Sequence, residues 1–129
     1  MATGFPASTG NVLTAAMFNE LVQYTINTQS GATYTLASTD QYQVLILTSN
    51  ASTKTVSIPT DATTNFGIGT AITIMNTGAG LLTINAVTPG TTTVTSAGAT
   101  SASPKVSQHN GAVCIKTAAN TWRVVGGIE

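Results

Sequence analysis

Charged side chains are scarce in this chain of 129 residues, because only 6% are Asp, Glu, Lys or Arg. An average globular domain has about a quarter. Binding to nucleic acid requires a cluster of basic residues that neutralises several phosphates. No basic residue here has a close basic neighbour in the sequence, so we expect no nucleic-acid partner. The four basic residues are Lys54, Lys105, Lys116 and Arg123.

The low charge also bears on self-association. Four acidic and four basic residues cancel to a net charge of zero, and the mean hydropathy is positive, at +0.25. A soluble monomer normally keeps a net charge and a well-charged surface, which prevent association. This composition therefore favours a chain that buries further surface in an oligomer or a larger assembly.

Residues that carry catalytic chemistry are nearly absent. The single cysteine, Cys114, excludes an intrachain disulfide and lies in the apolar segment AVCIK, where a buried side chain is expected. The single histidine, His109, lies beside a turn in SQHNG, so it is not expected to act as a base. Asp40 and Asp61 lie in the turn contexts STDQ and PTDA, where Asp bonds to nearby backbone. We therefore expect no enzyme, no cofactor and no metal site.

Aromatic residues make up only 5% of the chain, and Trp122 is the one tryptophan. A core of this size needs its aromatic side chains, so we expect Trp122 to be buried. An exposed Trp122 beside a groove would instead favour a carbohydrate-binding module. No apolar run approaches the roughly 18 residues that span a bilayer, and no basic residue precedes Lys54 as in a secretory signal. We expect no membrane contact and synthesis in the cytoplasm.

Threonine and serine are abundant, with 26 and 10 copies. Threonine is β-branched and fits a half-exposed pleated surface. From Tyr34 onward, about eight short apolar segments alternate with turn signals, which predicts an all-β fold. The arrangement expected is an antiparallel, jelly-roll-like β-sandwich. A β-helix would need a fixed repeat, and none is visible.

Two local patterns refine this prediction. Residues 42–47 are apolar on both faces, which is typical of a central or doubly covered strand. Gly78 and Gly80 in TGAG predict a tight hairpin with positive φ angles.

The N-terminal region differs in composition. Residues 1–12 are rich in Gly, Ser, Thr and Pro and predict an extended arm. The segment LTAAMFNELVQY has helical spacing, with Thr14 as N-cap and one apolar face. We predict an arm and one short helix within residues 1–30, followed by a sandwich domain at 31–129. The apolar face of the helix consists of Met17, Phe18, Leu21 and Val22.

Two stretches carry a resemblance to a known group of proteins. The opening MATGFPASTGNVLTAAMFNELVQY resembles the start of small structural proteins of tailed bacteriophages, including cyanophages. The body, from TYTLASTDQYQVLILTSNASTKTVSIP through FGIGTAITIMNTGAGLLTI to TWRVVGGI, resembles a β module of phage decoration, fibre and other virion-surface proteins. The usual module has SDAGK after its first strand, whereas this chain has STDQY at residues 38–42. No functional residue is carried over there.

The resemblance implies a non-enzymatic virion protein. A compact, stand-alone module suits a capsid decoration (cement) protein that is made in the host cytoplasm and sits on the capsid surface. Such proteins are commonly homotrimers that bridge subunits of the major capsid protein. The alternatives are a tail-associated fibre, knob or adaptor component, and a carbohydrate-binding module that contacts glycans. The arm and helix either contact the capsid and neighbouring subunits or close one end of the sandwich. The contact residues expected are Phe5, Val12, Leu13, Met17 and Phe18.

Overall fold

The computed structural model describes residues 14–16, 19, 23–96, 99–100 and 103–128. Within these residues the chain forms eleven strands and one 3-10 turn, η1 (Ser38–Asp40). The strands are short because polar or glycine-containing turns interrupt each apolar segment. They are β1 (Thr25–Gln29), β2 (Thr33–Thr35), β3 (Val44–Thr48), β4 (Lys54–Ile58), β5 (Ala71–Asn76), β6 (Leu82–Ala86), β7 (Thr93–Ser96), β8 (Ala99–Thr100), β9 (Lys105–Val106), β10 (Gly111–Ala118) and β11 (Thr121–Gly126).

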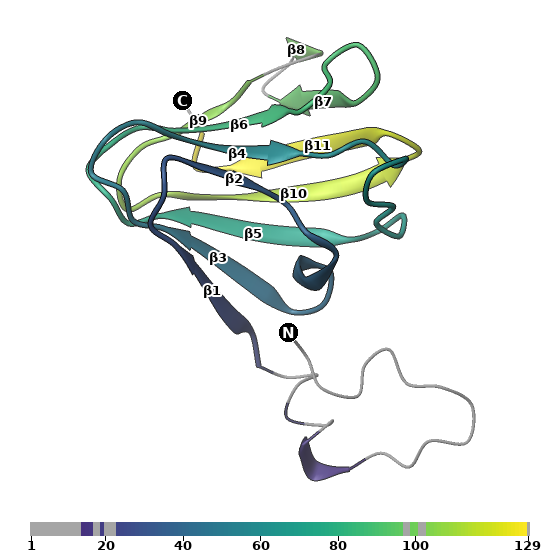
Figure 1. Cartoon of the computed structure of the whole chain (residues 1–129), viewed down its shortest axis with the longest axis horizontal. Helices are drawn as coiled ribbons and strands as arrows, with labels where there is room; N and C mark the ends of the chain where they lie inside the picture. The colour runs from purple at the N-terminus through teal and green to yellow at the C-terminus, as the bar shows by residue number, and fades with distance from the viewer. Residues whose placement is uncertain (1–13, 17–18, 20–22, 97–98, 101–102, 129) are drawn as a thin grey trace.

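The strands build two sheets that lie one over the other (Figure 1). The larger sheet has seven strands in the order β1-β3-β5-β10-β11-β7-β8, and the smaller has four in the order β2-β4-β6-β9. Alternate residues of both sheets point inward, and fourteen of them form a hydrophobic core together with Leu36 and Phe66 from the connections. The prediction of an all-β chain with two packed sheets is confirmed.

Strand pairing departs from the antiparallel prediction. The chain passes from one sheet to the other at each step from β1 to β6, so β1, β3 and β5 are parallel neighbours. In the small sheet, β2, β4 and β6 are likewise parallel. Each pair of successive strands, one in each sheet, forms one coil of the chain. Three such coils stack on one another as in a β-solenoid. The expectation of eight antiparallel strands in a jelly roll is wrong for this part of the chain, and so is the exclusion of a coiled β arrangement.

The coils differ in length, which explains why no repeat is visible in the sequence. Thr25 pairs with Val44, 19 residues later, in the first coil of the large sheet. Leu45 pairs with Thr73, 28 residues later, in the next. A search for a fixed period fails on such a chain, although each coil contributes one strand to each sheet.

Antiparallel pairing begins where the coils end. The β10–β11 hairpin inserts between β5 and β7, with β10 antiparallel to both β5 and β11. In the small sheet, β9 pairs antiparallel with β6. These elements cover the exposed edges that the last coil would otherwise present.

Gly78 and Gly80 lie in the connection from β5 to β6, which crosses between the sheets, so the hairpin predicted there is wrong. Positive φ among the described glycines occurs at Gly69 and Gly126 instead. A Cβ at residue 78 or 80 would overlap the backbone of the preceding coil, at Asn50 or Ser52. Glycine is required here because two loops approach closely.

The boundary between the N-terminal region and the β-sheets lies earlier in the chain than predicted. β1 (Thr25–Gln29) belongs to the large sheet, whereas the sequence placed residues 1–30 in the arm and helix. Ala15, Ala16 and Asn19 are helical, and the Gln23 N–H donates to the Asn19 carbonyl at 3.0 Å, as in the predicted helix. The predicted apolar face of the helix lies outside the described residues.

Candidate functional site: the outer face of the large sheet

His109 and Cys114, the residues considered for nucleophilic chemistry, lie in unlike surroundings. His109 is exposed in the turn between β9 and β10, with a φ of 68°. Cys114 is fully buried in the core, and this burial raises the pKa of its thiol to about 12. A thiol with that pKa is protonated at neutral pH and is a poor nucleophile.

Asp40 ends η1 and is buried, as the centre of a structural hydrogen-bond cluster. Its carboxylate accepts hydrogen bonds from Tyr34 Oη at 2.6 Å, Asn27 Nδ2 at 2.9 Å and the Ala37 N–H at 2.8 Å. The bond from Ala37 confirms the predicted turn role. Burial, together with the hydrogen bond to Asp40, raises the pKa of Tyr34 to about 12. The cluster joins β1, β2 and η1.

Asp61 has distant partners, unlike the local backbone bonding predicted for it. Its Oδ1 lies 2.8 Å from Nζ of Lys116, whose side chain is only 1% exposed. Its Oδ2 accepts the Asn120 N–H at 3.0 Å. The hydrogen bond from Lys116 holds the pKa of Asp61 below its usual value. Lys116 Nζ also donates to Asn65 Oδ1 at 3.0 Å and to the Phe66 carbonyl at 2.6 Å. This cluster joins the β4–β5 loop to the β10–β11 hairpin.

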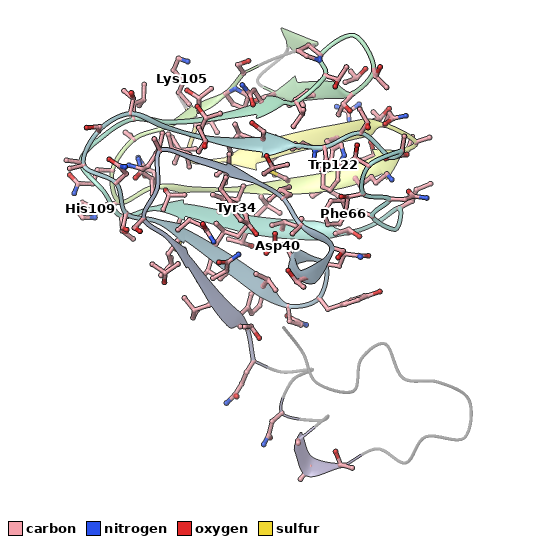
Figure 2. The ribbon with its side chains drawn as sticks, viewed as in Figure 1. Tyr34, Asp40, Phe66, Lys105, His109 and Trp122 are labelled. Carbon is pink, nitrogen blue, oxygen red and sulfur yellow. The ribbon has the colours of Figure 1, made fainter. Side chains whose placement is uncertain are left out.

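Trp122 is fully buried, which confirms the predicted core role. Its ring meets Phe66 edge-on, with centroids 5.5 Å apart and an interplanar angle of 85°. Figure 2 shows both rings at one end of the sandwich, opposite His109. Trp122 therefore provides no stacking platform for a sugar.

The outward side chains of the large sheet form an apolar surface, here called the apolar face. Its central row crosses five strands through the pairings Ile26–Leu45–Thr73–Val113–Val125. A second row runs through Thr28, Leu47, Met75 and Gly111, and a third through Ala71, Ile115, Arg123 and Thr95.

Three large apolar side chains of this face are strongly exposed. Ile26 is 52% exposed, Met75 42% and Val125 50%. Arg123 is the one charged residue in the three rows. The face combines large apolar side chains with threonine, and spans the strands from β1 to β11, which suits burial against a partner.

The outward face of the small sheet, here called the hydroxyl face, is polar. One row pairs Thr33, Thr55, Thr83 and Lys105, and a second pairs Thr35, Ser57 and Asn85. Ser57 Oγ donates to Asn85 Oδ1 at 2.8 Å across the two strands. The two sheets thus share one core but present opposite kinds of surface.

The contact residues predicted from the sequence, Phe5, Val12, Leu13, Met17 and Phe18, all lie outside the described residues. The apolar face was not predicted. The one indication of it in the sequence was the run at residues 42–47, which is apolar on both sides. From the sequence alone, this run was interpreted as a central or doubly covered strand. In the structure, Leu45 and Leu47 are half-buried on the outward side.

The chain matches none of the protein-family models, curated proteins or solved structures with which it was compared. Among the described residues, no helix has the length and hydropathy to cross a membrane. The same residues contain no group of three or more His, Cys, Asp or Glu placed to hold a metal ion.

Proposed function

We propose that the chain is a non-enzymatic structural protein of a phage virion, and that it decorates the capsid by docking its apolar face on the major capsid protein. The observation that carries this proposal is the contrast between the two outer faces. One sheet exposes the apolar side chains Ile26, Met75 and Val125 to water, which is unfavourable for a monomer in solution. The other sheet is covered with hydroxyl groups, which water solvates well. The hydroxyl face then points to solvent.

The size of the face decides how attachment works. Five strands about 4.8 Å apart, each about five residues long, cover a footprint of about 400 Å². A standard protein interface buries about 800 Å² on each partner. One face is thus too small for tight binding by itself. A homotrimer multiplies the contacts and makes attachment multivalent, and this supports the trimeric state expected from the resemblance.

Charge has little part in this attachment. Arg123 is the one charged residue in the three rows of the apolar face, so attraction between opposite charges contributes little to the contact. Binding driven by apolar burial depends only weakly on salt. Capsid binding should therefore survive an increase in ionic strength that would release a charge-driven partner.

Substitution of an outward residue tests the proposal. Met75→Glu places a charge in the second row of the face, where the side chain is already 42% exposed, so the fold tolerates it. The matched control is Val87→Glu, because Val87 is 52% exposed but follows β6, outside the face. Wild type and Val87→Glu should cosediment with capsids of the phage that encodes the chain, and Met75→Glu should not. Equal binding by all three proteins would contradict the proposal.

A tail-associated component remains the first alternative. Quantitative mass spectrometry of purified particles separates the two roles. A decoration protein has a copy number comparable with that of the major capsid protein, whereas a tail component is far rarer.

A carbohydrate-binding module is the second alternative, favoured by two exposed tyrosines. Tyr24 is 55% exposed and Tyr42 36%. The next residue after each tyrosine takes part in one hydrogen bond, from the Thr25 N–H to the Gln43 carbonyl at 2.7 Å. The two tyrosines are therefore attached to neighbouring backbone segments. Glycan-array binding that is lost on Tyr24→Ala would support this alternative over the capsid role.

A further inference from the structure

Lys116 is a buried amine in contact with both an acid and an amide. Its side chain is 1% exposed, and Nζ lies 2.8 Å from Asp61 Oδ1 and 3.0 Å from Asn65 Oδ1. The strand position of Lys116 pairs with Trp122, whose ring meets Phe66. An amine, a primary amide and a carboxyl group thus meet at the edge of the aromatic core.

We propose that Lys116 and Asn65 form an intramolecular isopeptide bond, with Asp61 as the acid and base that moves the proton. The bond forms between Lys116 Nζ and Asn65 Cγ, and the bond from Cγ to Nδ2 breaks. The amide nitrogen leaves as ammonia. No oxidant, reductant or cofactor is required, since the amine and amide are already present.

Protons balance through Asp61. The Lys116 ammonium first transfers a proton to Asp61 Oδ1, which leaves a neutral amine with a free lone pair. The amine attacks Cγ, and the protonated Asp61 stabilises the oxygen of the tetrahedral intermediate. A proton from Nζ then passes by way of Asp61 to Nδ2, so that ammonia departs. Asp61 finally gives the proton that it took from the lysine to the released ammonia. The products are an amide and an ammonium ion, and the Asp61 carboxylate is restored.

The first step follows a short path, because Lys116 Nζ and Asp61 Oδ1 are 2.8 Å apart and already share a hydrogen bond. The geometry is close to reactive. A carbonyl bond is about 1.2 Å long, so Cγ lies at most about 4.2 Å from Nζ, and a small rotation of the amide reaches the attack distance of about 3.5 Å.

The leaving group also has an exit. Asn65 is exposed as a residue, although its Oδ1 contacts the buried amine. Ammonia formed at Nδ2 can therefore leave to solvent, which drives the reaction towards the bond. The product would tie the β4–β5 loop to β10 at the end of the sandwich that carries Phe66 and Trp122 (Figure 2).

Intact-mass spectrometry of the full chain tests the proposal. After purification and prolonged incubation at neutral pH, the wild-type mass should be lower than the sequence mass by one ammonia. Trypsin provides the second readout, because an acylated lysine is not cleaved. The expected product is residues 55–105 joined to residues 106–123, with no cleavage after Lys116. A wild-type protein of full mass that is cleaved after Lys116 would overturn the proposal.

Three variants exclude other sources of ammonia loss, such as cyclisation at Asn110-Gly111. Asn65→Ala changes an exposed residue and leaves Asn110-Gly111 intact. It should show its full calculated mass if the ammonia comes from Asn65. Asp61→Asn keeps the shape of the acid and should also show full mass. Lys116→Arg keeps the positive charge but lacks the amine. If Lys116→Arg loses ammonia to the same extent as the wild type, the loss does not require the lysine amine and the isopeptide proposal is wrong.

Discussion

Gly80→Ala tests the stacking of the coils. Gly80 lies in the β5–β6 connection, and an added Cβ would overlap the carbonyl oxygen of Ser52 in the preceding coil. The three nearest atoms, from Ser52 and Thr53, all belong to the backbone, so no flexible side chain can move aside. The Gly80 carbonyl also accepts hydrogen bonds from Lys54 Nζ and Asn76 Nδ2, each at 2.8 Å. Separation of the loops would stretch both.

The expected cost follows from these contacts. Overpacking of a close contact costs about 1 to 3 kcal/mol. Weakening a hydrogen bond to a buried donor adds about 1 to 3 kcal/mol, and both Lys54 and Asn76 are buried. We expect Gly80→Ala to lower the free energy of unfolding by about 3 to 5 kcal/mol.

Urea denaturation measures this cost as a shift in midpoint at constant slope. Gly90→Ala is the matched control, because Gly90 lies in an exposed turn and its added Cβ would meet nothing within 4 Å. The control should remain within about 0.5 kcal/mol of wild type. If Gly80→Ala is as stable as Gly90→Ala, the two coils do not approach as described.

Three further predictions concern the core, the Asp40 cluster and the proposed cross-link. Trp122 Nε1 is buried and has no hydrogen-bond partner among the described residues, so Trp122→Phe removes an unsatisfied donor. In urea denaturation Trp122→Phe should cost clearly less than Phe66→Ala, for which we expect a loss of about 3 to 5 kcal/mol. The folded protein holds the Tyr34 phenol proton to about pH 12, whereas the unfolded chain releases it near the ordinary value of 10.0. The unfolding free energy should therefore fall as pH rises above 10, and Tyr34→Phe should reduce this slope in alkaline denaturation. If the isopeptide bond forms, it spans 51 residues, and loop entropy predicts that Asn65→Ala loses about 4 kcal/mol of stability; a change below about 0.5 kcal/mol, typical of exposed sites, would indicate no cross-link.

The strands could largely be predicted from the sequence, because alternation of apolar and polar residues sets which side chains face the core. Val56 and Ile58, for example, alternate with Thr55 and Ser57 in the sequence, and both are buried on the inner side of β4. The direction of pairing could not be predicted. Alternation is the same in parallel and antiparallel strands, and the unequal coil lengths hide the repeat.

The candidate site was only partly visible in the sequence. Low charge predicted association, but the apolar face depends on the register that aligns Ile26, Leu45 and Val125 across non-consecutive strands. The cluster at Lys116 was missed for a similar reason. Asp61 and Asn65 lie more than 50 residues earlier in the chain, and no local pattern joins them to the lysine.

Cryo-electron microscopy of intact particles tests the central claim most directly, because it locates each copy of the chain and shows which sheet meets the partner. We predict density on the capsid surface, with the seven-stranded sheet against the major capsid protein and the hydroxyl face towards solvent. Density at the tail, or a capsid contact made by the four-stranded sheet, would contradict the claim.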